Sequence, residues 1–207
     1  MRTLLLVCAL AVTAAAAEAP PFSHKLHLQQ KLECSTCHSK AVLSTQASDN
    51  LLPSNQVCAK CHERSAVPAP RAHHVQKFNH ALHLKMGNVA PVIARAIDTG
   101  AYLGPVPPGL RARLNTKNAC AACHRGMEES MAVSRSAAMP RMADCLVCHN
   151  RIEPPFSCEK CHTGVEKLKP ASHTQDWVDV HSSGTQKLDK QSCAVCHGRD
   201  FTCQGCH

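Results

Sequence analysis

The sequence has very few aromatic residues. They make up 3% of the chain, with one Trp and one Tyr, whereas a mature chain of about 190 residues would normally bury a large side-chain core. Outside the N-terminal segment there is no apolar run of the roughly 20 residues that span a bilayer, so we expect no transmembrane segment in the mature chain. The formal net charge is +8, but basic blocks and aromatic stacking platforms are missing, which argues against nucleic-acid binding.

The N-terminal segment is typical of a secretory signal peptide, which we place at residues 1–17. Arg2 supplies the positive charge, Leu4–Val12 the apolar stretch and Ala14–Ala17 the small residues before the cleavage site. The mature protein is therefore expected to be exported. The periplasm is the first expectation, and the cell surface or the extracellular space are alternatives.

Cysteine, in contrast, is abundant. Fourteen of the 15 cysteines lie in seven copies of Cys-x-x-Cys-His, and the fifteenth, Cys8, lies in the signal peptide. This motif is the attachment signature of c-type haem, in which both thiols bond to the porphyrin and the His becomes the proximal iron ligand. The attachment cysteines are Cys34, Cys37, Cys58, Cys61, Cys120, Cys123, Cys145, Cys148, Cys158, Cys161, Cys193, Cys196, Cys203 and Cys206. The proximal histidines are His38, His62, His124, His149, His162, His197 and His207.

One such motif alone can also be half a zinc site, a redox dithiol or a disulfide. Neither zinc nor a disulfide requires a His after every pair, so the repetition favours seven covalently attached c-type haems. Porphyrins would then replace the missing side-chain core, and their propionates would offset the positive charge. The predicted fold is mostly irregular and haem-cored, with short α-helices at the motifs and little or no sheet.

Eight histidines lie outside the motifs, at His24, His27, His73, His74, His80, His83, His173 and His181. If the adjacent pair His73-His74 supplies one ligand, which we assign to His74 while leaving His73 open, seven distal ligands remain for seven irons. Methionine is the other possible distal ligand. An iron with both axial positions filled by protein has no site for a substrate, so the predicted protein is not an enzyme.

Two stretches of the sequence repeat the same pattern. Phe22–Leu28 reads Phe-Ser-His-Lys-Leu-His-Leu and Phe78–Leu84 reads Phe-Asn-His-Ala-Leu-His-Leu. Histidines three residues apart share one face of a helical turn and can reach two different haems. A Phe-x-His-x-x-His stretch upstream of Cys-x-x-Cys-His resembles the class III, low-potential multihaem cytochromes c.

That resemblance implies pairings between these histidines and the attachment sites. His24 would ligate the haem of the first site, Cys34/Cys37, and His80 that of Cys120/Cys123. His27 and His83 would go to later haems, most simply those of Cys58/Cys61 and Cys158/Cys161.

A second repeat lies in the C-terminal half, where the motifs at 145–162 match those at 193–207. Within each unit the two attachment sites are 13 or 10 residues apart, so their porphyrins must nearly touch. Such closely paired sites resemble the doubled Cys-x-x-Cys-His cytochromes of metal-respiring bacteria. His173 and His181 are the expected distal ligands of the second unit. No free His lies between His124 and His149, which leaves His73 or His74 for the haem of Cys145/Cys148.

We expect three modules in one continuous haem-cored unit. These are a two-haem module at 18–67, a central three-haem module at 68–165 and a two-haem module at 166–207. Proline residues mark the first boundary. Residues 86–110 form an insertion in the central module, and helical spacing of apolar residues predicts a helix at 88–98 within it.

The function predicted from these features is electron transfer in anaerobic or metal-type respiration. The expected partners are redox protein donors and acceptors, among them a quinol-oxidising membrane complex, and the sites nearest the chain ends are candidates for electron exchange with them. Two alternatives stay open: a multihaem reductase with one open iron, and a subunit of an oligomer or of a haem-stacked extracellular filament.

Overall fold

The computed structural model describes residues 22–63, 75, 77–132, 139–149, 158–164, 168, 170, 173–183 and 190–197. Several predicted features lie outside these residues. They are the signal peptide 1–17, both module boundaries, the doublet His73-His74, and the last attachment site with Cys203, Cys206 and His207.

Short helices make up the described part of the chain. The α-helices are α1 (His24–Gln29), α2 (Cys34–Cys37), α3 (Asn55–Cys58), α4 (His80–Lys85), α5 (Ala90–Asp98), α6 (Leu110–Arg113), α7 (Ala119–Cys123), α9 (Met142–His149), α10 (Trp177–Ser182) and α11 (Lys190–His197). The 3-10 helices are η1 (Ser39–Leu43), η2 (Met127–Glu129) and η3 (Cys158–Lys160). Within the described ranges the only β pairing is an isolated antiparallel bridge between Val75 and His162. This confirms the predicted fold class.

Each described motif forms a helical turn for a local reason. In four of them the His backbone N–H donates to the carbonyl of the first Cys, four residues back, at 2.8–3.0 Å. In the other two, the motif forms the end of α9 and of α11. Residues three and four apart lie on one face of such a turn, so both thiols and the His project to the same side.

The two Phe-x-His-x-x-His stretches fold alike, as α1 and α4. Each helix begins after a polar N-cap residue whose side chain accepts a backbone N–H three residues on: Leu26 N to Ser23 Oγ at 3.3 Å and Leu82 N to Asn79 Oδ1 at 2.8 Å. Such caps satisfy backbone donors that a six-residue helix would otherwise leave open.

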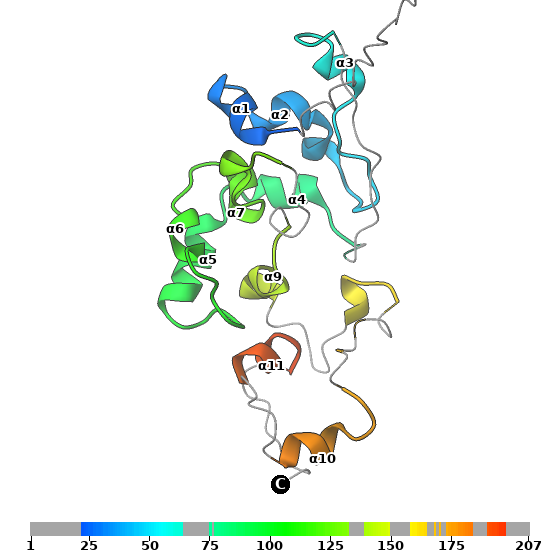
Figure 1. The fold of residues 1–207 in the computed structure, drawn as a ribbon, viewed down its shortest axis with the longest axis vertical. Coiled ribbons are helices and arrows are strands. Elements are labelled where there is room, and N and C mark those ends of the chain that lie inside the picture. The colour runs from blue at the N-terminus through cyan, green and yellow to red at the C-terminus, as the bar shows by residue number, and fades with distance from the viewer. Residues whose placement is uncertain are drawn as a thin grey trace, which may run out of the picture.

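The two repeats pack across each other. Lys25 N in α1 donates to Ser130 O, just after η2, at 3.0 Å, and Ala81 N in α4 donates to Ser44 O, just after η1, at 2.9 Å. Each histidine-bearing helix therefore lies against the segment that follows the other repeat's first motif. Figure 1 shows the resulting elongated molecule, with α1, α2 and α3 at one end, α10 and α11 at the other, and α4 to α9 between them.

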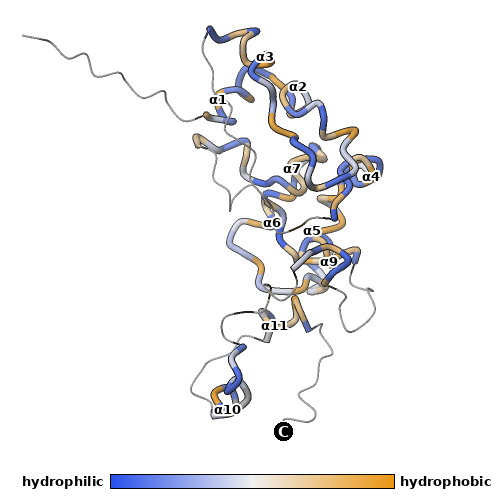
Figure 2. Tube along the Cα trace, turned by 90° about the vertical axis from the view of Figure 1, so that its right-hand side faces the viewer, coloured by the Kyte–Doolittle hydropathy of each residue, from blue (hydrophilic) through white to orange (hydrophobic). Residues whose placement is uncertain are grey.

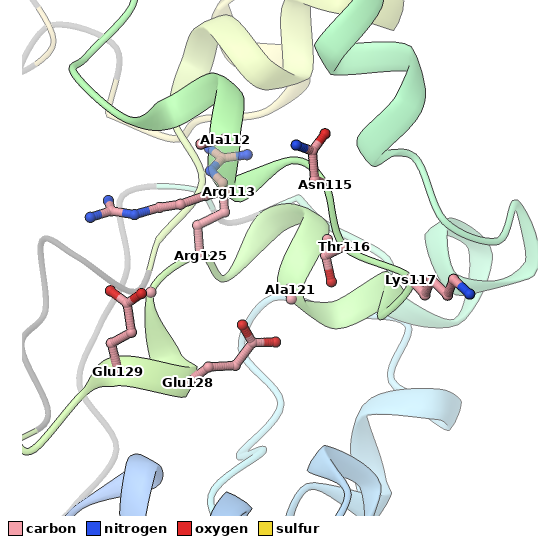
Figure 3. Close-up of a pocket in the computed structure, with 10 residues that line it drawn as sticks. Ala112, Arg113, Asn115, Thr116, Lys117, Ala121, Arg125, Glu128 and Glu129 are labelled. Atoms are coloured by element: carbon pink, nitrogen blue, oxygen red, sulfur yellow. The ribbon is translucent and has the colours of Figure 1, made fainter.

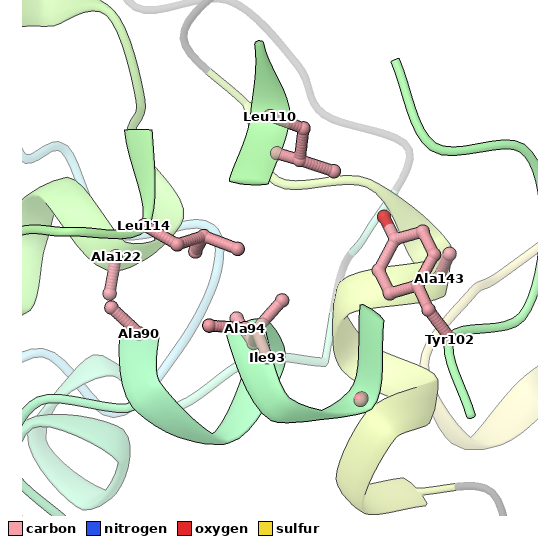
Figure 4. Packing of buried hydrophobic residues seen from close by; sticks show 9 residues of the cluster. Ala90, Ile93, Ala94, Tyr102, Leu110, Leu114, Ala122 and Ala143 are labelled. Atoms are coloured by element: carbon pink, nitrogen blue, oxygen red, sulfur yellow. The ribbon is translucent and has the colours of Figure 1, made fainter. Parts of the chain in front are cut away.

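A small apolar cluster lies in the middle of the molecule, where α5 packs against α7 and α9 (Figure 4). Its buried members are Ala90, Ile93, Ala94, Ala96, Tyr102, Leu110, Leu114, Ala122 and Ala143. More than half are alanines, and none of the large side chains in the described residues is fully buried. The helix α5 lies within the range predicted at 88–98, and its apolar face packs on α7 and α9.

Elsewhere the described chain has little side-chain core. Figure 2 shows hydrophobic and hydrophilic segments interspersed along the length of the molecule. Leu26 and Leu82, at equivalent positions of α1 and α4, are 52% and 58% exposed. Large apolar side chains beside the candidate ligands are thus placed to contact a flat apolar group, as a haem-cored fold requires.

Candidate functional site

Histidine rings face one another in pairs along the molecule. The ring centroids are 6.4 Å apart for His24 and His38, 5.9 Å for His27 and His62, 6.5 Å for His80 and His124, 6.3 Å for His83 and His149, and 6.2 Å for His173 and His197. In every pair one member belongs to a Cys-x-x-Cys-His motif and the other does not.

These separations fit a metal ion between each pair of rings. An imidazole–metal bond is about 2.0 Å, and the centre of an imidazole lies about 1.2 Å from its nitrogen by covalent geometry. Two ligands on opposite sides of one iron therefore have ring centres roughly 6.4 Å apart. The attachment cysteines lie beside each pair, so the residues present fit a covalently attached haem.

Hydrogen bonds fix which ring nitrogen faces the gap. The Nδ1 atoms of His27 and His83 lie 2.7 Å from the carbonyl oxygens of Ser23 and Asn79, and that of His38 lies 2.8 Å from another backbone carbonyl. A carbonyl only accepts, so Nδ1 must carry the proton and donate. The lone pair then resides on Nε2, as iron ligation requires, and such carbonyl partners are typical of metal-bound histidines.

His24 is a different case within the first repeat. Its Nδ1 is buried with no hydrogen-bond partner among the described residues. Burial lowers the pKa of this imidazole, and the nearby His38 and His27 rings lower it further. The neutral ring that results is the form that binds a metal.

One aromatic ring supports each set of distal histidines. Phe22 meets His24 edge-on at 4.9 Å and stacks on His27 at 4.5 Å. Phe78 does the same in the second repeat, at 4.6 and 4.3 Å from His80 and His83.

The third set uses the only Trp of the chain. Trp177 stacks on His173 at 4.8 Å and on His181 at 5.5 Å. Three of the few aromatic residues, Phe22, Phe78 and Trp177, thus contact candidate ligands.

The structure agrees with three of the pairings implied by the class III resemblance and differs in one. His24, His80 and His27 face the proximal histidines of Cys34/Cys37, Cys120/Cys123 and Cys58/Cys61, as expected. His83 was expected at Cys158/Cys161, but it faces His149, which belongs to Cys145/Cys148.

The repeat itself contained the signal for this difference. In each copy the first His faces the next attachment site along the chain, and the second His faces the site after that. Applied to the second copy, this rule predicts that His83 faces His149. It also removes the need for His73 or His74 at Cys145/Cys148.

The remaining predicted residues are placed only in part. His173 faces His197, as expected for the last module. His162 lies at the bridge with Val75, and Lys77 N donates to Cys161 O at 3.2 Å. His181 was expected, with His173, at the two sites of the last unit, and the second of these sites lies outside the described residues.

Cysteines of different motifs lie side by side near the N-terminal end. Burial raises the pKa of the Cys120 thiol, and the Cys34 thiol, to which it is hydrogen-bonded, raises it further. Asn118 Nδ2 also contacts Cys34 Sγ at 3.5 Å. Burial likewise raises the pKa of Cys37, with a contribution from the nearby Cys58 thiol. The first motif therefore lies between the second and the third.

The same kind of contact continues towards the C-terminal end. Burial is the main cause that raises the pKa of Cys145 to about 11. Nearby charged groups, among them the Cys123 and Cys161 thiols, raise this pKa further. Burial raises the pKa of Cys196, and the nearby Cys158 thiol adds to it. The described motifs thus follow one another in space in a single series.

An open pocket of about 460 Å³ lies beside α7 and does not contain a histidine pair (Figure 3). Its lining includes the basic residues Arg113, Lys117 and Arg125 and the acidic residues Glu128 and Glu129, but no histidine.

In the described residues no three His, Cys, Asp or Glu side chains gather as a metal-binding group. The described helices are too short or too polar to cross a membrane.

The comparison with known families decides the class of the protein. Residues 27–207 match the family described as outer membrane cytochrome MtrC/MtrF-like, domains II/IV. The chain belongs to this family. It is therefore a multihaem c-type cytochrome, which agrees with the repeated motifs and the facing histidines. No curated protein and no solved structure matches the cytochrome.

Proposed function

We propose that this cytochrome carries electrons through seven covalently attached c-type haems, each held by two histidines. The observation that supports this most is the set of five facing histidine pairs at 5.9–6.5 Å. Bound haem supplies the one-electron iron couple.

The protein's own residues fix where each of these groups is held. The motif cysteines and proximal histidines project from single helical turns, which sets attachment and ligation together. In α1 and α4 the second histidines, His27 and His83, are oriented by backbone carbonyls and by stacking on Phe22 and Phe78. If two histidines hold the iron at every site, the chain would leave no open position for a substrate, which supports a carrier and not an enzyme.

The order of the attachment sites along the molecule differs from their order in the chain. The neighbouring thiols support the series Cys58/Cys61, Cys34/Cys37, Cys120/Cys123, Cys145/Cys148, Cys158/Cys161 and Cys193/Cys196. Electron exchange at the N-terminal end is thus proposed at Cys58/Cys61 and not at Cys34/Cys37. Cys61 is exposed, and α3 lies at the tip of the molecule in Figure 1.

The distal ligand of the Cys158/Cys161 site is proposed to be His74, with His73 as the alternative. Val75 is bridged to His162, and Lys77 Nζ also donates to Glu159 O at 2.9 Å. The histidine doublet directly precedes Val75 in the chain, so it is the nearest available source of a ligand once His83 is assigned to His149.

The proposed location is the cell surface. The family description supports it over the periplasm, which was the first expectation from the signal peptide. The proposed partners are redox proteins that donate and accept electrons. A quinol-oxidising membrane complex would deliver electrons only through further carriers.

The test is a low-temperature EPR spectrum of the fully oxidised, haem-loaded protein, with the haem content of the same sample from a pyridine haemochrome. We expect seven haems per chain, all low-spin. A high-spin ferric signal equal to about one haem would overturn the fully ligated carrier. It would favour the multihaem reductase with one open iron instead.

A further inference from the structure

A buried ion pair lies between the third and fourth attachment sites. The side chains of Arg125 and Asp144 are 7% and 2% exposed, and Arg125 Nη2 donates to Asp144 Oδ2. The Tyr102 hydroxyl donates to Asp144 Oδ1 at 3.0 Å, and Arg141 N donates to Oδ2 at 2.7 Å. Arg125 Nη1 also donates to the carbonyl of Ala122 at 2.7 Å. Both charged groups therefore have hydrogen-bond partners inside the fold, which a buried ion pair requires.

Chain connectivity ties each charge to a different site. Arg125 directly follows His124, the proximal His of Cys120/Cys123. Asp144 directly precedes Cys145, the first cysteine of the next site. Tyr102 comes from the insertion, at the edge of the apolar cluster beside Ala143 (Figure 4). The insertion thus supplies, through Tyr102, a hydrogen bond to the Asp144 carboxylate.

We propose that the Arg125–Asp144 pair, capped by Tyr102, positions these two sites and, by remaining neutral as a pair, sets the reduction potentials of the two groups that they hold. This rests on the proposed function, because it requires bound haem at both sites.

The charges near the two sites determine the direction of the effect. Reduction adds one negative charge at an iron, so an uncompensated positive charge nearby favours the reduced form and an uncompensated negative charge opposes it. Buried charges are screened weakly compared with exposed ones. As a pair, Arg125 and Asp144 largely cancel; removal of one partner leaves a full charge beside both sites.

The experiment is a spectroelectrochemical titration of the holoprotein carrying Asp144→Asn. We expect two of the seven one-electron steps to move to higher potential. A shift of tenfold in the reduction equilibrium corresponds to about 59 mV for a one-electron couple. The double variant Arg125→Gln/Asp144→Asn removes both charges, and its two steps are expected to return to within about threefold of the unmodified protein, or roughly 30 mV by the same constant.

Asp98→Asn is the matched control. Asp98 also pairs with an arginine, Arg111, at 2.7 Å, but the two side chains are 50% and 43% exposed. We expect no measurable shift. If Asp144→Asn does not fold, Arg125→Gln carries the test with the opposite sign. In that variant Asp144 keeps the hydrogen bonds from the Tyr102 hydroxyl and from Arg141 N.

The outcomes separate this inference from the proposed function. Equal potentials in Asp144→Asn and the unmodified protein, with thermal stability lowered, would reduce the pair to a structural role and overturn the inference. Equal shifts of the reduction potentials in Asp144→Asn and in the double variant would also overturn the inference. The double variant removes both charges, so charge could not then be the cause of the shift. Fewer than seven haems or a high-spin iron in the unmodified protein would instead contradict the proposed function.

Discussion

Replacing His83 with Ala tests the pairing between α4 and α9. The His83 ring centroid lies 6.3 Å from that of His149, a separation that one iron between two imidazoles accounts for. Phe78 stacks on His83 at 4.3 Å, but its side chain has no atom that can ligate iron. It therefore cannot replace the imidazole that the variant lacks. The variant should therefore convert one iron in seven from low-spin to high-spin.

The assay is low-temperature EPR on the oxidised protein, with haem content measured in parallel. Two additional backgrounds identify the affected site. In Cys145→Ala/Cys148→Ala, which lacks that haem, His83→Ala should add no high-spin signal. In Cys158→Ala/Cys161→Ala the signal should remain. Lys85→Ala, an exposed change on the same helix, serves as the inert control.

The reverse result would refute the reasoning. If the high-spin signal persists without the Cys145/Cys148 haem and disappears without the Cys158/Cys161 haem, then His83 serves His162, as the class III resemblance implied. A fully low-spin spectrum in His83→Ala alone would show that another side chain replaces it or that it is no ligand.

Two further predictions concern stability. Expressed without haem attachment, the chain should lose most of its helical far-UV circular dichroism, because its described residues bury no large side chain fully; a native-like spectrum in the haem-free protein would contradict the haem-cored fold. Gly104→Ala should lower the melting temperature more than Gly87→Ala. Both glycines have positive φ, which costs a side chain about 1–2 kcal/mol, but only at Gly104 (φ 107°) would a Cβ lie 2.7 Å from Val195 Cγ2, whereas at Gly87 it meets nothing within 4 Å. Equal losses in the two variants would show that the contact between this loop and α11 is not tight.

Local features of the fold were predictable because they depend on a few neighbouring residues. A Cys-x-x-Cys-His stretch closes one helical turn through its own backbone, so short helices at the motifs followed from the spacing. The spacing of the two histidines in Phe22–Leu28 and in Phe78–Leu84 indicated a helical turn, and α1 and α4 contain these turns. The scarcity of aromatic residues correctly indicated that side chains alone do not form the core.

Features that join distant parts of the chain were decided only by the tertiary structure. The proximal His is placed by its own motif, but a distal His can reach any site that packing brings near it. His83 lies opposite His149, which is 66 positions further along the chain, and no local feature of α4 determines that pairing. Arg125 and Asp144, 19 residues apart, were not singled out in the sequence, since each looks like an ordinary surface charge until the fold buries them together.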